Sequence, residues 1–177
     1  DEVTWDYQVL ESEGKTETNV VLVAIKSDVV TSLLGIITPM NLDPSIIEHR
    51  PLGLYNCIRF NKEIEVDKIT VVIDIGARAT DLIIESEGQP CLTRSARIGS
   101  GDITEAIQKE LNIDFDEAET LKIEKGAVYL SDDDENSADE ISRRIWHAIN
   151  PVIGEILTEL QRSVSYFHSQ LEGGKID

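Results

Sequence analysis

The chain has 177 residues, 41% of them apolar, which is enough for one ordinary domain or two small ones with a real core. Its 34 acidic and 16 basic side chains give a formal net charge of −18. A field of that sign repels a phosphate backbone and argues against nucleic acid as a partner. No apolar run approaches the roughly 20 residues of a membrane helix, and the acidic N-terminus carries no secretory signal. We therefore expect a cytoplasmic protein whose connection to a membrane comes through a partner.

The sequence holds no recognisable cluster of metal ligands. Cys57 and Cys91 lie far apart, and we expect reduced, partly buried thiols, with a disulfide as the alternative. The run from Asp132 to Glu135 lacks the alternating ligands of a calcium loop and is expected to be a solvated acidic loop. His147 and His168 have no partner at ligand spacing, so both are expected at the surface or the core boundary.

Hydrophobic periodicity in residues 1–60 predicts a small β-β-α-β subdomain followed by a linking helix. The expected elements are strands over 4–12 and 19–25, a helix from Ser27 to Pro39, a short strand at Ile46 and Ile47, and a helix from Pro51 through Ile58. Ser27 is a good helix cap, and Pro51 suits the first turn of a helix. Asn41 suits the left-handed conformation that often follows a helix.

Residues 68–177 predict an antiparallel meander followed by helices. The hairpin core is expected over 69–98, with its third strand at Cys91–Ile98. A helical part follows over 101–130, with a capping box at Asp114 and Glu117. A long amphipathic helix is expected over 138–171, capped by Ser137 and Glu140 and ended by Gly173 and Gly174. Pro151 should kink the long helix or break it in two. Trp146 falls on its apolar face and is expected in the core.

The stretch from Val71 to Ile84 is the most informative part of the sequence. Two apolar runs flank a tight polar turn, which indicates a strand, a short connection and a return strand. Asp74 lies at the mouth of this hairpin, and Gly76 leaves room beside the backbone. Turn amides and the Thr80 hydroxyl can wrap a phosphate, and Asp74 can hold its magnesium ion. The alternative is a buried hairpin with a solvated turn.

A second loop with phosphate-binding character opens the next helix. Gly99, Ser100 and Gly101 come at a helix N-terminus, where free amides and a partial positive charge suit an anion. Glu119 and Lys122 could then contact the ribose and the base of a nucleotide. The alternatives are glycines that merely allow a tight strand-to-helix turn, and an ordinary i,i+3 ion pair on a solvated helix face.

The order of these motifs resembles the PilM family, actin-like cytoplasmic proteins of type IV pilus assembly that are related to FtsA. The resemblance rests on Asp74-Ile-Gly76-Ala77, Thr80-Asp81, Arg97-Ile-Gly99-Ser100-Gly101-Asp-Ile-Thr104, Glu117-Ala118-Glu119-x-x-Lys122 and Ser163 to Phe167. It implies an α/β fragment of the actin/Hsp70-type ATPase fold. By the same resemblance ATP and Mg²⁺ are the cofactors, with Asp74 at the metal and Gly76, Ala77, Thr80, Gly99, Ser100, Gly101, Thr104, Glu119 and Lys122 around the nucleotide. Arg78, Ala79 and Ser100 depart from the small or hydroxyl residues and the second glycine that are usual in the family.

The resemblance implies a nucleotide-dependent scaffold of a type IV pilus or related secretion system. Its partner would be the cytoplasmic tail of an inner-membrane assembly protein, bound near residues 1–50, and its chemistry at most weak ATP hydrolysis with no identifiable catalytic base. The chain begins at Asp1 without a methionine, so we interpret it as a fragment that binds ATP poorly by itself. The alternatives are an interaction module without nucleotide and a small-molecule kinase of the same superfamily.

Overall fold

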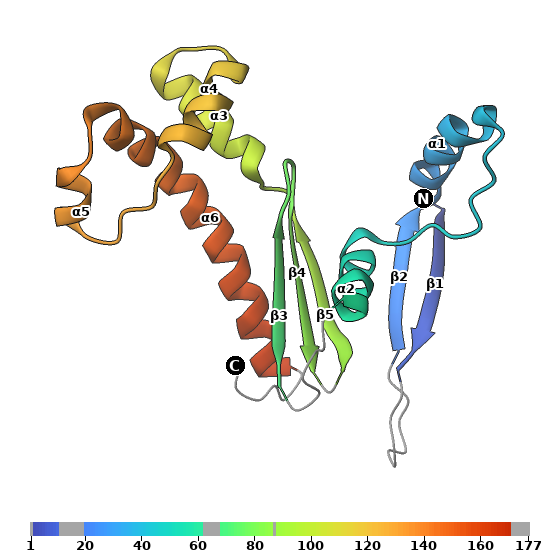
Figure 1. The fold of residues 1–177 in the computed structure, drawn as a ribbon. Helices are drawn as coiled ribbons and strands as arrows, with labels where there is room; N and C mark the ends of the chain where they lie inside the picture. Colours follow the sequence, from blue (N-terminus) through green and yellow to red (C-terminus); the bar gives the residue numbers. More distant parts are fainter. Residues whose placement is uncertain (1, 11–19, 62–67, 87, 171–177) are drawn as a thin grey trace.

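A two-stranded sheet and a short helix form the N-terminal unit of the protein. The computed structural model describes residues 2–10, 20–61, 68–86 and 88–170. Strand β1 (Val3–Val9) pairs antiparallel with β2 (Val20–Lys26), and α1 (Ser27–Ile37) follows directly, as Figure 1 shows. A 3₁₀ turn, η1 (Thr38–Met40), ends at Asn41, whose φ of 57° confirms the left-handed conformation expected there.

Two local details of this unit differ from expectation. Ser27 is the first residue of α1 rather than its cap: its backbone N–H donates to the Glu2 carbonyl at 3.1 Å, and its hydroxyl bonds that of Thr4. The strand pairing therefore satisfies this helix end. Ile46 and Ile47 form no strand, and they lie in a segment without regular secondary structure. Their side chains instead line a groove beside the β1–β2 sheet, described below.

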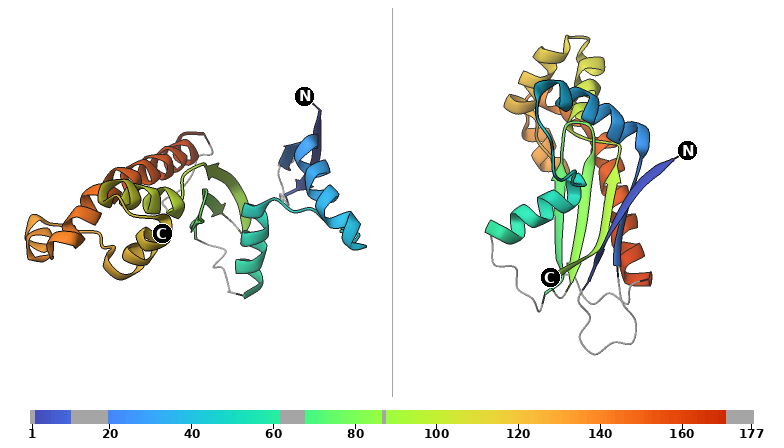
Figure 2. Two further views of the ribbon diagram at one scale, coloured as in Figure 1. Left: turned by 90° about the horizontal axis from the view of Figure 1, so that it is seen from above. Right: turned by 90° about the vertical axis from the view of Figure 1, so that its right-hand side faces the viewer.

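A three-stranded antiparallel sheet forms the centre of the second part. Its strands are β3 (Thr70–Ile75), β4 (Thr80–Ser86) and β5 (Gln89–Ala96), in that spatial order. Helix α2 (Arg50–Asn61) lies on the side of this sheet that faces the N-terminal unit (Figures 1 and 2). The meander predicted from the sequence is confirmed, although β5 starts before Cys91.

The remaining chain is helical. Helices α3 (Ser100–Leu111), α4 (Phe115–Lys125) and α5 (Asp132–Ser137) precede the long α6 (Glu140–Gln170). One core cluster joins α3, α4 and α6 and is made by Ile107, Ala118, Ile145, Trp146 and Ile149. A second cluster packs Phe167 of α6 against Leu82 and Ile84 of β4. Trp146 is thus a core residue, as expected.

Helix α6 and the segment before it correct three expectations. The acidic run Asp132–Glu135 is helical because the Ser131 hydroxyl caps α5 and four acidic residues favour a helix N-terminus. Asp139, rather than Ser137 and Glu140, caps α6 by accepting from the Ser142 N–H at 3.0 Å. Helix α6 continues through Pro151, so the predicted break is wrong, whereas a kink at this residue stays a prediction. Its expected end at Gly173 and Gly174 lies outside the described residues.

The cysteines and histidines are at the surface. Cys57 and Cys91 form no disulfide, and both are exposed rather than partly buried. The Nε2 of His147 lies 2.9 Å from Oε1 of Glu135 in α5, and this polar contact links α5 to α6. In the described ranges no three His, Cys, Asp or Glu side chains gather as a metal site would require.

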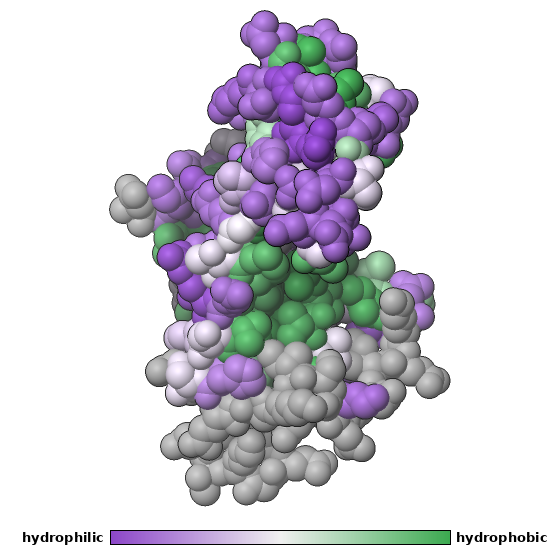
Figure 3. All heavy atoms as spheres, turned by 90° about the vertical axis from the view of Figure 1, so that its left-hand side faces the viewer, coloured by the Kyte–Doolittle hydropathy of each residue, from purple (hydrophilic) through white to green (hydrophobic). Residues whose placement is uncertain are grey.

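The surface shows where this fold leaves apolar side chains uncovered. Ile73 and Ile75 of the edge strand β3 and Leu157 of α6 are about half exposed. The face seen in Figure 3 has an apolar area in its middle, below a polar upper part. Among the helices of the described residues, we find none with the length and hydropathy of a membrane span.

Candidate functional site

The tip of the β3–β4 hairpin is held together by its own backbone and by the segment that follows β5. The Gly76 N–H donates to the Ala79 carbonyl at 2.9 Å, which closes the turn. Thr80 begins β4 and is buried, and its hydroxyl donates to the Ile98 carbonyl at 2.8 Å. Asp74 is half-buried near the end of β3. The Thr80 hydroxyl therefore ties β4 to the segment between β5 and α3 rather than pointing into open space.

The N-terminus of α3 docks directly onto this hairpin tip. The Ser100 N–H donates to the Gly76 carbonyl and the Gly101 N–H to the Ala77 carbonyl, each at 2.8 Å. The Gly99 N–H donates to the Asp102 carboxylate at 2.7 Å. The first amides of a helix have no partner inside the helix, so these contacts satisfy them with protein groups. The two loops predicted to bind phosphate thus lie together and bond each other.

Close packing explains the glycines of this junction. A Cβ on Gly99 would lie 2.4 Å from the Gly76 carbonyl oxygen, and one on Gly101 would lie 2.7 Å from the Ala77 carbonyl oxygen. Neither distance is tolerable, because carbon and oxygen come into contact well beyond 3 Å. These two glycines let the helix approach the hairpin within hydrogen-bond distance.

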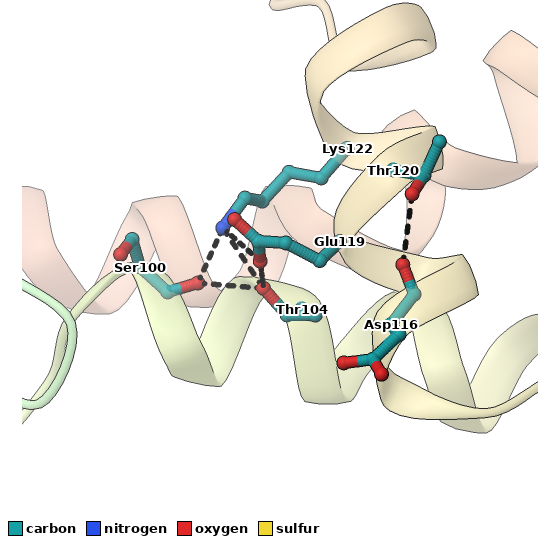
Figure 4. A network of polar contacts seen from close by, with 6 residues as sticks. All are labelled: Ser100, Thr104, Asp116, Glu119, Thr120 and Lys122. Carbon is teal, nitrogen blue, oxygen red and sulfur yellow. Dashed lines mark hydrogen bonds and ion pairs between the residues drawn. The ribbon is translucent and has the colours of Figure 1, made fainter.

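A polar network joins the start of α3 to α4, as Figure 4 shows. The Lys122 ammonium donates to the Glu119 carboxylate at 2.6 Å, to the Thr104 hydroxyl at 2.9 Å and to the Ser100 carbonyl at 3.2 Å. The Thr104 hydroxyl lies 2.5 Å from Glu119 Oε2, to which it donates. A lysine has three N–H donors, and here each has a partner.

Electrostatics reinforce this network. The Lys122 ammonium and the Thr104 hydroxyl, both bonded to Glu119, lower the pKa of its carboxyl below the ordinary value. The i,i+3 ion pair considered from the sequence is therefore present, and it is anchored on α3 through Thr104 and Ser100. A role for Glu119 and Lys122 in contacting a nucleotide stays a prediction.

The groups that remain available for an anion lie at the hairpin tip. The N–H groups of Ala77 and Arg78 donate to no acceptor among the described residues, and both residues are exposed. Two consecutive turn amides fit a phosphate oxygen, and Asp74 near them fits a phosphate-bound magnesium ion. Part of the predicted nucleotide site is therefore open in this structure, and part is used internally.

Arg50 is a component of this region that sequence reasoning missed. It is the first residue of α2, and its Nε donates to Asp81 Oδ2 at 2.5 Å while Nη2 contacts the same oxygen. Asp81 is only 1% exposed and lies opposite Asp74 in the β3–β4 register. Two carboxylates at such a position repel each other unless a cation is near. The sequence feature that could have pointed to a cation here is Asp81, an acidic residue directly before a buried apolar run.

A groove of about 400 Å³ runs beside the β1–β2 sheet. One wall is the sheet face that carries Thr4, Asp6, Gln8, Val21, Val23 and Ile25. The other wall is the irregular segment before α2 and its first turn, with Ile46, Ile47, Glu48, His49 and Leu52. The lining is mostly apolar, with two carboxylates at Asp6 and Glu48. These features suit an extended apolar segment that carries positive charge.

Known proteins of the actin-like fold are similar to this chain in sequence and structure. The family model for cell division protein FtsA matches residues 71–158. A chain of a PilM–PilN type IV pilus biogenesis complex is 29% identical with a TM-score of 0.76, over 96% of this chain and 46% of that chain. MreB 5 of Spiroplasma citri, solved with AMPPNP, is 16% identical with a TM-score of 0.51, over 86% of this chain and 64% of that one.

The chain has the fold of the actin-like ATPases. It is PilM-like over nearly its whole length, so the fold and the resemblance predicted from the motif order are confirmed. The likeness to MreB 5 shows the fold alone. The chain spans less than half the length of the PilM–PilN chain that it matches. In the PilM-like fold the hairpin tip and the groove lie on opposite sides of α2 (Figure 1).

Proposed function

We propose that this chain is part of a cytoplasmic, nucleotide-dependent scaffold for a type IV pilus or related secretion system. In this proposal the scaffold binds the cytoplasmic tail of a PilN-type inner-membrane protein and is peripheral to the membrane through it. The observation that carries the proposal is the groove beside β1 and β2, in a chain that aligns over 96% of its length with one from a PilM–PilN complex. Nucleic acid has no place in this function, since the net charge is −18.

The chemistry of the groove supports a peptide as its occupant. Val21, Val23 and Ile47 offer apolar surface to alternate side chains of an extended segment. Asp6 and Glu48 offer negative charge to basic residues, which are frequent on the cytoplasmic side of membrane proteins. A tail with alternating apolar and basic residues therefore fits this surface.

The nucleotide part of the proposal rests on the hairpin. ATP would supply a phosphate chain and its magnesium ion, and Asp74 would hold that metal while the Ala77 and Arg78 amides contact the phosphates. Gly76, Thr80, Gly99, Ser100, Gly101 and Thr104 would keep the hairpin and α3 in register. We expect hydrolysis to be slow, because the described part of the chain offers no carboxylate that is identifiable as a base.

Two substitutions one residue apart test the groove. Val23 lines it, whereas Leu22 points to the opposite face of the same strand and is 62% exposed. We expect Val23→Glu to weaken binding of a synthetic PilN-type tail peptide at least about tenfold in calorimetry, or about 1.4 kcal/mol. Leu22→Glu should leave the affinity within a factor of about two.

Ile47→Glu provides a second variant, since Ile47 is exposed in the groove wall and its replacement should not disturb folding. Circular dichroism of all variants checks that they are folded. An equal loss for Leu22→Glu and Val23→Glu, or no binding by the unsubstituted chain, would contradict the proposal.

One observation favours a second candidate, an interaction module without nucleotide. The Ser100 and Gly101 amides and the Thr80 hydroxyl, all expected to meet phosphates, donate to backbone carbonyls instead. This candidate keeps the groove and drops ATP, so nucleotide titration separates the two. No observation here favours a small-molecule kinase.

A further inference from the structure

Helix α2 covers a face of β4 that carries two buried carboxylates. Asp81 and Glu85 are 1% and 0% exposed, and they are four residues apart on one face of the strand. Asp81 Oδ1 and both oxygens of Glu85 are the buried side-chain polar atoms without a hydrogen-bond partner in the described ranges. Such atoms are costly because they have lost water and gained nothing. Burial accordingly raises the pKa of Glu85, and the nearby Arg59 opposes this.

The helix carries an arginine near each of these carboxylates, and neither arginine uses its full bonding capacity there. Arg50 places both Nε and Nη2 on one oxygen of Asp81, although guanidinium and carboxylate pair best through two parallel bonds. Arg59 donates to the Gly88 carbonyl at 2.8 Å and to the Tyr55 hydroxyl at 3.3 Å, and not to Glu85. Two cations and three unpartnered oxygens thus face each other across one helix–sheet contact.

We propose that α2 has a second seating on β4, in which Arg50 pairs with both oxygens of Asp81 and Arg59 pairs with Glu85. All three buried oxygens gain a partner in this arrangement. The Gly88 carbonyl does not lose its last donor, because the Tyr55 hydroxyl also bonds it at 2.9 Å. The shift therefore leaves no new buried group unsatisfied. The two seatings differ in which donors Arg50 and Arg59 offer to β4.

The second seating has a consequence that rests on the proposed function of the groove. The groove wall is tied to the first turns of α2: the Asn56 amide donates to Glu48 at 2.5 Å, and the Gly53 N–H donates to the His49 carbonyl at 3.0 Å. On its other side α2 bonds Asp81 through Arg50, and Asp81 lies opposite Asp74 in the β3–β4 register. A peptide that moves the groove wall therefore shifts α2 and changes the hairpin. Such coupling is reciprocal, so a ligand at the hairpin would change peptide affinity by the same factor.

Relaxation-dispersion NMR on the ¹⁵N-labelled chain tests the two seatings without any ligand. We expect microsecond-to-millisecond exchange at amides of residues 50–61 and 76–81. Glu85→Gln and Arg59→Gln remove the new ion pair and should suppress the exchange. Arg144→Gln is the matched control, because it breaks an exposed arginine–glutamate pair between α6 and α3, away from α2. Absence of exchange in the unsubstituted chain, or full exchange in folded Glu85→Gln, overturns the proposal.

Addition of the PilN-type tail peptide tests the coupling. Binding should shift the amide resonances of residues 74–81 in the unsubstituted chain and in Arg144→Gln, and shift them at least several-fold less in Glu85→Gln. If the peptide does not bind, the proposed function fails, and the dispersion result decides the seatings by itself. If it binds and the hairpin resonances stay in place, the proposed function stands and the coupling is overturned.

Discussion

Asp139 is the residue on which the start of α6 depends. Its carboxylate accepts from the Ser142 N–H at 3.0 Å and from the Ser142 hydroxyl at 2.9 Å, and it forms an ion pair with Lys125 of α4 at 3.1 Å. These bonds, led by that of the Ser142 N–H, lower the pKa of Asp139 to about 2. One side chain thus caps the longest helix and fastens it to the end of α4.

A pH dependence follows from this cap. Because the folded pKa is depressed, the stabilisation is fully present above the ordinary value of 3.8 and is lost as pH falls through about 2. Asp139→Ala should therefore lower the melting temperature at pH 7, and the deficit should shrink between pH 4 and pH 2. Asp43→Ala, in the irregular segment before α2, serves as control in the same circular-dichroism melts. A deficit that is independent of pH would contradict this role.

Single-residue rules explain some helix ends in this chain and fail at others. Asp114 caps α4 by accepting from the Glu117 N–H at 2.8 Å, as its spacing predicts. The same pattern at Ser137 and Glu140 misleads, because Asp139 lies closer to the first free amides of α6 and offers a stronger acceptor. The partnership of Arg50 with Asp81 spans 31 positions, and no local pattern contains it.

At the scale of elements, the contact between the hairpin and α3 determines how the candidate site is built. Gly99→Ala would place a methyl group 2.4 Å from the Gly76 carbonyl oxygen, so the helix must move away and lose its bonds to the hairpin. We expect a loss of about 1–3 kcal/mol in the free energy of unfolding, measured by urea denaturation.

Gly154 offers the matched control within α6. Nothing lies within 4 Å of a Cβ built on it, and it is exposed in the middle of the helix. Gly154→Ala should stabilise the protein by about 0.5–1 kcal/mol, because alanine loses less conformational freedom in a helix. If both substitutions were stabilising, the close packing of α3 on the hairpin would not be what requires Gly99.

Hydrophobic periodicity predicts helices and strands well where one face of the element is buried. It fails for exposed segments, whose conformation depends on caps and charges. The apolar spacing of α6 and the apolar runs of β3 and β4 follow directly from burial, since Phe167 of α6 packs against Leu82 and Ile84 of β4. The run Asp132–Glu135 has no buried face, so its helical conformation depends on the Ser131 cap and the helix dipole. Pro151 does not end α6, because packing of Ile145, Ile149 and Ile156 holds the helix on both sides of it.

At the scale of the whole molecule, motif order predicts more than any single motif. The hairpin, the glycine turn and the Glu119–Lys122 helix each have an ordinary structural explanation, yet their order led to the actin-like fold that the comparisons show. The contacts among these motifs could not be predicted, since hydrogen bonds between the two loops depend on tertiary docking. The structure thus confirms the fold and leaves the nucleotide contacts as predictions.

The hydrogen bonds among these motifs predict that the chain binds ATP weakly. The donors expected to meet the nucleotide are largely used: the Ser100 and Gly101 amides bond hairpin carbonyls at 2.8 Å, and Lys122 bonds three protein oxygens. The Ala77 and Arg78 amides remain, in a chain with a net charge of −18 that repels a polyanion.

We therefore expect this 177-residue chain to bind Mg·ATP with a Kd weaker than about 1 mM, that is, by less than about 4 kcal/mol. Isothermal calorimetry with Mg·ATP measures this directly, with Asp74→Asn as the companion variant. Binding that does not saturate below about 1 mM is the expected outcome. Saturable micromolar binding that Asp74→Asn abolishes would contradict it. The bonds between α3 and the hairpin would then have to open to admit the phosphates, because the tip amides alone provide too few donors for such an affinity.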